Sequence, residues 1–280
     1  MAENTARVAT TFLAEHGFSL YLENNGIRIL YDTGHSDIFI RNAEKLNIDL
    51  TGLDYVIISH GHADHSGGLR YLIDYYKEKK VMRKPVLLMT EPRIFLRRRA
   101  LIDRGPGGVQ ECSFEVDREE LDRCFLVEFE PGVRWLTSDL VYLGKPERKN
   151  DFEGKVPQVP KILIHGTWED DLVEEDTQLA YLHRNKEEIS IFSGCSHSGL
   201  CNIIEFAKKV TGASRIHTFL GGMHLQSPPE WVMEKTKTYI ENAGVKQFYA
   251  CHDIDLPSKL QLIAVSNFKD CGVGTAVELI

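Results

Sequence analysis

Several features that mark other classes of protein are missing from this chain of 280 residues. The opening residues Met1-Ala2-Glu3-Asn4 have neither the basic nor the apolar region of a signal peptide. No apolar run is long enough to cross a bilayer. The formal net charge of −8 is unfavourable for a dedicated nucleic-acid-binding protein. These absences predict a cytoplasmic protein with no membrane segment and no nucleic-acid partner.

Cysteine is scarce, and its spacing matches no common motif. The six cysteines include no Cys-x-x-Cys pair, so neither a zinc finger nor a dithiol redox motif is indicated. The chain is also too long for a small disulfide-stapled scaffold, and we expect reduced thiols. The hydrophobic fraction of 42% is sufficient for a sizeable core.

The sequence does contain a dense group of metal-binding side chains in the hexapeptide His60-Gly61-His62-Ala63-Asp64-His65. This hexapeptide follows the apolar run 55–59, whose β-branched residues predict a buried strand. Imidazole suits zinc, iron or manganese, and a carboxylate adds an oxygen ligand. Because so short a loop cannot direct all four side chains at one ion, we predict two ions. His60 and His62 would bind the first ion, and Asp64 and His65 the second.

Strand and helix patterns alternate on both sides of the hexapeptide. Residues 18–23 and 27–31 predict a hairpin, and two sheets with helices outside would satisfy the whole order of elements. We expect one domain over residues 1–280, with an arginine-rich insertion or lid at about 90–171. The other predicted strands are 86–89, 125–129, 178–183, 189–192, 216–220 and 247–250, and the predicted helices are 37–46, 69–76, 200–210, 230–242 and 256–266.

Three further histidines, His197, His224 and His252, each follow an apolar strand pattern. Small residues flank each of them and allow a close approach of the backbone to a site. Loops at strand ends are where sheet-based enzymes place their chemistry. We therefore predict that all three histidines contribute to the metal ligands.

These patterns resemble a known family. The His60-x-His62-x-Asp64-His65 loop after a strand is similar to the signature of the metallo-β-lactamase-fold superfamily. The resemblance implies an α+β fold, a four-layer αβ/βα sandwich with the metals at one edge of two sheets. Asp32, which ends the strand 27–31, matches the first motif of that superfamily. The resemblance implies that Asp32 orients a ligand histidine rather than binding metal.

Five motifs lie at residues 14–19, 29–34, 59–69, 193–199 and 221–225. Together they resemble one branch of this superfamily, the branch of the 7,8-dihydropterin-6-methyl-4-(β-D-ribofuranosyl)aminobenzene 5′-phosphate synthase. One departure is the absence of a Gly-Asp pair, whose aspartate bridges both metals in many members. Gly194-Cys195 is the candidate for the equivalent place, with Cys195 or His197 as the donor. The choice between His224 and His252 for the second metal stays open.

Several other side chains could bind a substrate. Arg93 and Arg97 belong to the densest basic cluster, which also contains Arg98, Arg99 and Arg104. On a helix, Arg93 and Arg97 would share a face and could bind phosphate, although a solvated helix face is the alternative. The amides that begin the helix 200–210 could also receive an anion.

The pair Glu15-His16 could face the metals as well. His16 would then act as an acid or base or hydrogen-bond the substrate, with Glu15 beside it, although a simple turn at a strand end is the alternative.

The combined patterns predict a binuclear metal-dependent hydrolase for a small anionic, phosphorylated substrate. Metal-bound hydroxide would be the nucleophile, with Asp64 and His16 as catalytic residues. Two divalent ions are expected, zinc first, with iron or manganese as alternatives. The second hypothesis is a synthase that joins a dihydropterin methyl diphosphate to a ribofuranosylaminobenzene 5′-phosphate. The sequence shows neither a flavin domain nor a DNA-binding helix pair that would favour a redox module or sensor, and it leaves a homodimer open.

Overall fold

The computed structural model describes residues 1–102, 108–155 and 160–279. Its first sheet has the strand order β1-β2-β3-β4-β7. β1 pairs with β2 as an antiparallel hairpin, and the strands from β2 to β7 run parallel. The strands are β1 (Leu20–Asn24), β2 (Ile27–Tyr31), β3 (Tyr55–Ile57), β4 (Val86–Met89) and β7 (Leu126–Phe129).

The second sheet has the strand order β15-β14-β13-β12-β9-β8. β13, β14 and β15 are parallel to one another, whereas β12, β9 and β8 are joined by antiparallel pairs. The strands are β8 (Arg134–Trp135), β9 (Leu140–Tyr142), β12 (Gln178–Leu182), β13 (Glu188–Ser193), β14 (Arg215–Gly221) and β15 (Gln247–Ala250).

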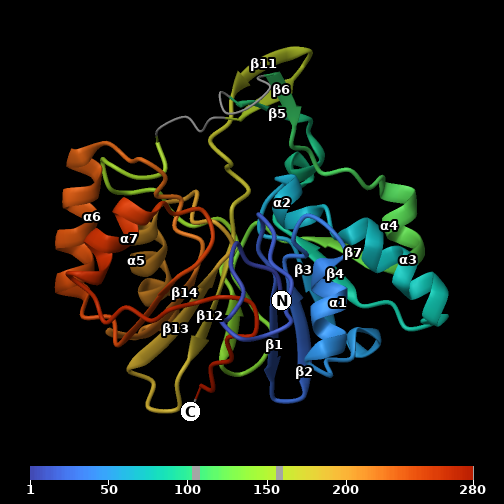
Figure 1. The fold of residues 1–280 in the computed structure, drawn as a ribbon, viewed down its shortest axis with the longest axis horizontal. Coiled ribbons are helices and arrows are strands. Elements are labelled where there is room, and N and C mark those ends of the chain that lie inside the picture. The colour runs from blue at the N-terminus through green and yellow to red at the C-terminus, as the bar shows by residue number, and fades with distance from the viewer. Residues whose placement is uncertain (103–107, 156–159, 280) are drawn as a thin grey trace.

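Helices cover the outer face of each sheet, and Figure 1 shows the two groups on opposite sides of the molecule. α1, α3 and α4 cover the first sheet, and α5, α6 and α7 cover the second. None of the helices in the described residues has the length and apolar character that a membrane span requires. The helices are α1 (Ile38–Lys45), α2 (Ala63–Ser66), α3 (Leu69–Lys79), α4 (Arg118–Cys124), α5 (Leu200–Thr211), α6 (Glu230–Ala243) and α7 (Leu256–Ile263), with 3₁₀ turns at Leu50–Gly52 and Pro92–Phe95.

The core lies in three layers, one between the sheets and one under each group of helices. In β2, Ile29 and Tyr31 point into the layer between the sheets, and Leu30 points toward the helices. Strand residues alternate between the two faces, so a strand buried on both sides reads as a continuous apolar run. The four-layer α+β sandwich expected from the sequence is therefore confirmed.

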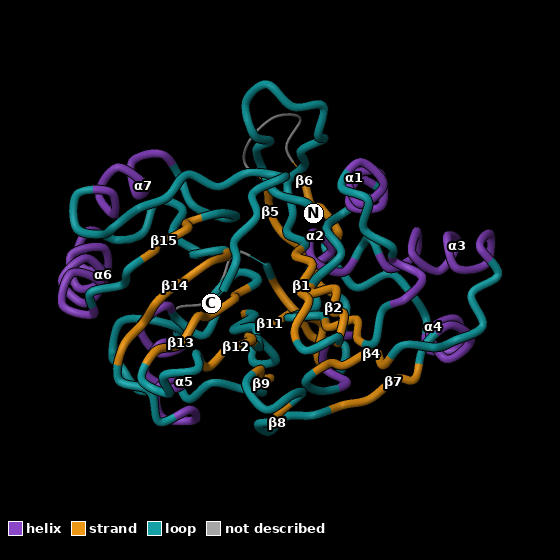
Figure 2. Tube along the Cα trace, turned by 90° about the horizontal axis from the view of Figure 1, so that it is seen from below, coloured by secondary structure: helices purple, strands orange, loops and turns teal. Residues whose placement is uncertain are grey.

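The segment 90–171 contributes to three sheets. β7, β8 and β9 belong to the two main sheets, while β5, β6, β10 and β11 form a separate sheet in the order β11-β10-β5-β6. Figure 1 shows this third sheet projecting beyond the sheet edge that carries α2, and Figure 2 shows the molecule from a second direction. A lid function for this segment stays a prediction. Its strands are β5 (Arg98–Ile102), β6 (Gly108–Glu111), β10 (Lys161–Ile164) and β11 (Thr167–Asp170).

Glu188 joins three parallel strands at their amino ends. It is paired in register with Arg215, and its nearly buried carboxylate contacts Arg215 Nε at 3.3 Å and the ammonium of Lys246. The hydrogen bond from Lys246 is the main cause that lowers the pKa of Glu188 to about 2 from its ordinary 4.5.

We expect Glu188→Gln to lower the free energy of unfolding by about 1–2 kcal/mol at pH 7, because the lysine and arginine lose their anionic partner. The native pKa is depressed, so the carboxylate stabilises the fold above pH 4.5 and loses this effect as the pH falls toward about 2. Urea unfolding should therefore show the gap to wild type narrowing below pH 4.5. Glu187→Gln, at the exposed neighbour, is the matched control, and a gap that is independent of pH would refute the assignment.

Candidate metal centre

The predicted ligand loops meet at one edge of the two sheets. β2, β3, β13, β14 and β15 end at this edge, since parallel strands place their carboxyl ends together. The hexapeptide follows β3 and forms α2 (Figure 1). Three more loops, 194–199, 222–229 and 251–255, extend from the second sheet. The sequence patterns therefore located the loops that come together in space.

His60, His62 and His197 form a first cluster of buried imidazoles. His60 Nε2 lies 3.1 Å from His62 Nδ1 and 3.2 Å from His197 Nε2. Burial, together with the neighbouring imidazoles, holds the pKa of His60 and of His197 well below the usual value. Neutral imidazoles with converging nitrogens are the donors that divalent metals require.

Asp64, His65 and His252 form a second cluster around one carboxylate. Asp64 Oδ2 lies 3.1 Å from His252 Nε2, 3.7 Å from His65 Nε2 and 3.2 Å from His16 Nε2. Burial opposes ionisation of Asp64, but the surrounding imidazoles hold its pKa well below the usual range. His16, which is more exposed, has a raised pKa chiefly through its hydrogen bond with Asp64.

Cys195 lies between the two clusters. Donor atoms of Cys195, His65 and His252 lie within 4.8 Å of one another, as do those of Cys195, His197 and His224. His224 Nδ1 is 2.5 Å from Asp253 Oδ2, and Cys195 donates to the same oxygen at 3.3 Å. The structure therefore groups His252 with Asp64 and His65, and it groups His224 with His197, while Cys195 lies within reach of both groups.

The second nitrogen of most of these imidazoles has a partner outside its cluster. Such contacts fix the ring and its tautomer and direct the other nitrogen inward. The inward nitrogen of His65 is Nε2, which is buried and makes no hydrogen bond within the described residues. The pairs are His60 Nδ1 with Ser59 Oγ at 2.8 Å, His65 Nδ1 with Asp32 Oδ2 at 2.8 Å and His252 Nδ1 with Asn4 Oδ1 at 3.1 Å. His62 Nε2 lies 3.9 Å from Asp171 Oδ2, which is beyond hydrogen-bond distance.

Asp32 lies behind the ligand loop, as the resemblance implied. Its fully buried carboxylate accepts hydrogen bonds from Ser59 N and Ser59 Oγ, both at 2.7 Å, besides contacting His65. Gly194 passes so close that a Cβ there would lie 2.6 Å from Asp32 Oδ2. A glycine at this position therefore allows the two sheets to bring their loops together.

A buried arginine packs against the backbone of the hexapeptide. Arg98 is fully buried, and it donates to Asp171 Oδ2 at 2.7 Å and to Glu175. Glu175 in turn accepts from Gly61 N at 3.3 Å. A Cβ on Gly61 would lie 2.3 Å from the Arg98 guanidinium, so the loop rests directly on this group. Burial tends to raise the pKa of the Asp171 carboxyl, but the neighbouring His62 and Arg98 hold this pKa below its usual value.

The residues proposed to bind a substrate are engaged in contacts within the protein. The prediction that Arg93 and Arg97 share a helix face is wrong, because the chain forms a 3₁₀ turn at Pro92–Phe95 and then enters β5. Arg97 is exposed and paired with Glu111, and Arg93 Nε lies 4.0 Å from Glu175 Oε2. The Glu15 carboxylate accepts from the amides of residues 35 and 36. Arg104 lies outside the described residues.

The amides at the start of α5 are already occupied. The buried Glu153 carboxylate accepts from Cys201 N at 2.9 Å and from Asn202 N at 3.2 Å. The prediction that a substrate anion binds here is therefore wrong for these two amides. The chain supplies its own anion to the positive end of the helix.

Both clusters open into one cavity of about 470 Å³. Ala100, Glu111 and Cys112 of the third sheet and its connections form another part of the lining. No lysine or arginine is present among the described residues that line it. The lining residues of the clusters are His16, His62, Asp64, Cys195, His197, His224 and His252, with Asp253 beside them.

A family model described as the metallo-beta-lactamase superfamily matches residues 14–183. The chain belongs to this superfamily. Its metallo-beta-lactamase fold places the loops 59–65, 194–199 and 251–255 at one edge, as the sequence motifs predicted.

Two relatives align with this chain over most of its length. The chain is 29% identical over 264 residues to the 7,8-dihydropterin-6-methyl-4-(beta-D-ribofuranosyl)-aminobenzene-5'-phosphate synthase of Methanocaldococcus jannaschii, which covers 90% of this chain and 85% of that protein. An uncharacterized protein of the same organism is 28% identical over 246 residues, covering 86% and 84%. The predicted resemblance to the synthase branch is thus confirmed as a sequence similarity.

Solved structures agree with the family assignment. The crystal structure of a metal-dependent hydrolase of the beta-lactamase superfamily aligns with a TM-score of 0.79 at 25% identity, covering 99% of this chain and 96% of that chain. The short form of human tRNase Z aligns with a TM-score of 0.52 at 10% identity, covering 99% and 97%, and shows a shared fold alone.

The residues at the edge fit divalent metal ions. The clusters combine imidazole, carboxylate and thiol donors, the set that zinc and similar ions prefer. The orphaned His65 Nε2 and the close pair His60 Nε2 and His62 Nδ1 would each be satisfied by an ion. His60, His62 and His197 would hold one ion, and Asp64, His65 and His252 the other.

Proposed function

We propose that this protein is a binuclear metal-dependent hydrolase for a small anionic, phosphorylated substrate. The observation that carries the proposal is the pair of donor clusters facing one cavity, with Cys195 between them. Two bound ions would supply a hydroxide nucleophile at neutral pH and stabilise the charge of the transition state. Zinc is the first choice, and iron and manganese are the alternatives.

The residues of the chain have separate tasks in this reaction. Asp32 accepts a hydrogen bond from His65 Nδ1, which directs His65 Nε2 into the second cluster. The Asp171 carboxylate lies 3.9 Å from His62 Nε2 and adds negative charge beside the first cluster. His16 lines the cavity with its Nε2 beside Asp64, where it can give a proton to a leaving group or take one from water. Asp64 holds that imidazole in place.

An anionic substrate would depend on the bound ions for its positive partner. Its lining has the carboxylates of Asp64, Glu111 and Asp253 and no lysine or arginine within the described residues. Bound divalent ions would be the positive charges that attract a phosphate there. A relative whose name ends in 5'-phosphate synthase supports this class of ligand.

A synthase is the second candidate, and the 29% identity to the Methanocaldococcus jannaschii enzyme favours it. In that reaction a dihydropterin methyl diphosphate would join a ribofuranosylaminobenzene 5′-phosphate. The same clusters would stabilise the leaving diphosphate.

One experiment separates the two candidates. Metal-loaded protein should contain about two divalent ions by elemental analysis. It should also release phosphate or alcohol from a panel of phosphoesters, and chelation should abolish this turnover. Incubation with the dihydropterin diphosphate and the aminobenzene phosphate is the second arm. Coupling in that arm without phosphoester turnover would favour the synthase, and metal binding without either reaction would refute both.

A further inference from the structure

Two thiols face each other at the end of β15, the edge strand of the second sheet. Cys251 Sγ lies 2.8 Å from Cys271 Sγ, although the two residues are 20 positions apart in the chain. Both cysteines are free in this structure, and Cys251 is buried whereas Cys271 is partly exposed. The sulfurs of a disulfide lie about 2.0 Å apart, so these two side chains already point at each other and need to approach by less than about 1 Å.

The chain that follows α7 runs beside β15 and brings the two thiols together. Phe248 and Phe268 form a parallel bridge, and Lys269 N donates to Phe248 O at 2.8 Å. Cys251 and Cys271 each follow three residues after this bridge and keep its offset of 20 residues. The backbone pairing of the two segments therefore places the thiols next to each other.

Residues next to both thiols hold a ligand of the second metal cluster. His252 directly follows Cys251, and its Nδ1 lies 3.1 Å from Asn4 Oδ1. The neighbour of Asn4 is Thr5, whose Oγ1 donates to Cys271 O at 3.2 Å. The segment of Cys271 thus holds the amino-terminal segment that contacts His252, and a bond between the thiols would close this set of contacts.

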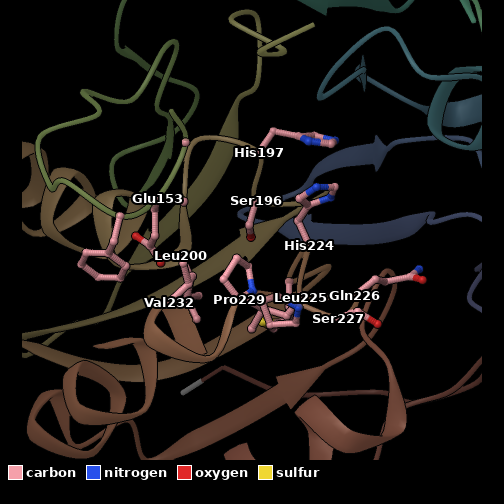
Figure 3. Close-up of a pocket in the computed structure, with 15 residues that line it drawn as sticks. Glu153, Ser196, His197, Leu200, His224, Leu225, Gln226, Ser227, Pro229 and Val232 are labelled. Atoms are coloured by element: carbon pink, nitrogen blue, oxygen red, sulfur yellow. The ribbon is translucent and has the colours of Figure 1, made fainter. Parts of the chain in front are cut away.

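The loop 251–255 also supports the loop that carries His224. Leu225 N donates to Asp253 O at 2.9 Å. Figure 3 shows His224, which directly precedes Leu225, next to His197 of the first cluster. A restraint on the loop 251–255 therefore reaches residues of both clusters.

We propose that Cys251 and Cys271 form an oxidation site, at which a low-molecular-weight disulfide such as glutathione disulfide converts the two thiols into an intramolecular disulfide. Cys271, the more exposed thiol, attacks glutathione disulfide as a thiolate, forms a mixed disulfide and releases one glutathione thiol. Cys251 then attacks the Cys271 sulfur and releases the second glutathione thiol. The protein loses two protons and two electrons, and one glutathione disulfide is reduced to two thiols. The new bond ties the segment of Cys271 to the loop that carries His252.

The test incubates the whole chain with glutathione disulfide until no further change occurs, alkylates the remaining thiols under denaturing conditions and digests the protein with trypsin. The tryptic peptides 247–259 and 270–280 contain one cysteine each. Wild type should yield these two peptides joined, with a mass two hydrogens below their sum. Cys271→Ser should abolish the link. Cys124→Ser, at a cysteine of α4, is the matched control and should leave the link intact.

The disulfide should raise the midpoint of thermal unfolding of chelator-treated wild type by at least about 3 °C, because it constrains the unfolded chain across 20 residues. Reduction should reverse this shift, and Cys271→Ser should show none.

In metal-loaded protein, a chelator should remove the ion of the second cluster more slowly after oxidation. This expectation alone rests on the proposed metal centre, since the peptide link and the unfolding midpoint are measured without metal. Alkylation of both cysteines in oxidised wild type, or a lasting glutathione adduct on Cys271, would overturn the proposed disulfide. A disulfide that changes neither the unfolding midpoint nor the release of the ion would overturn the restraint of the ligand loop.

Discussion

Asp64→Ala is expected to reduce phosphoester turnover at least roughly a thousandfold and to lower the metal content from about two ions to about one. Asp64 is the carboxylate of the second cluster, within 3.7 Å of His65, His252 and His16. Its removal leaves imidazoles with neither an oxygen donor nor the negative charge that offsets a divalent cation. The first cluster keeps its three histidines and should keep its ion.

The fold should survive this substitution, because the backbone of Asp64, and not its side chain, makes the local contacts. Asp64 O accepts from Phe18 N at 3.1 Å, and Gly17 packs so closely that a Cβ there would lie 2.6 Å from the same oxygen. Alanine preserves both features. Loss of activity would therefore report on the side chain rather than on unfolding.

Elemental analysis, turnover and thermal unfolding of the same preparation provide the measurement. Asp74→Ala removes an exposed carboxylate from α3 and is the matched control, with no expected change in metal content. His197→Ala should remove the ion of the first cluster. The two variants together would then assign one ion to each cluster. Retention of about two ions and full turnover in Asp64→Ala would refute the assignment of the second cluster.

Local spacing was enough to predict which loops come together at one edge of the two sheets. The hexapeptide keeps four donors within six residues, and His197 and His252 each follow a strand whose apolar pattern is evident. Parallel strands then bring those loops to one edge, because their carboxyl ends share it. The grouping of His252 with Asp64 could not be predicted, since it depends on how the two sheets pack.

Contacts between distant residues escaped the sequence reasoning. Arg98 and its partners Asp171 and Glu175 are 73 and 77 residues apart along the chain. The acidic run 169–176 was a visible signal, but no spacing rule links it to an arginine in another segment. The predicted helix at Arg93 and Arg97 failed because pairing with β10 draws the chain into β5, and tertiary context overrides local propensity.

Arg98→Met is expected to lower the free energy of unfolding by about 3–5 kcal/mol. The substitution removes the cation that pairs with Asp171 and Glu175, both fully buried, and leaves Glu175 with Arg93 Nε at 4.0 Å. An unpaired buried charge costs far more than the loss of an exposed pair. Arg97→Met is the matched control, because the adjacent arginine is exposed and, within the described residues, forms its ion pair with Glu111. It should have little effect on the free energy of unfolding.

Urea unfolding in the presence of a chelator is the appropriate measurement for Arg98→Met. Bound metal would stabilise the native state by mass action and would mask part of the loss. The chelator therefore isolates the contribution of the buried charges. A loss no larger than that of Arg97→Met would show that water or rearrangement satisfies the two carboxylates.

A triple variant, Arg98→Met with Asp171→Leu and Glu175→Leu, separates stability from metal binding. Apolar groups in place of all three charges should recover most of the stability lost in Arg98→Met. Metal affinity should nevertheless stay lower than in wild type by roughly 10–100-fold, since His62 Nε2 no longer faces Asp171 and Gly61 N loses the Glu175 oxygen. Competition with a chelating dye measures this affinity. Recovery of both properties together would mean that the buried charges support the fold of the loop and do not orient its ligands.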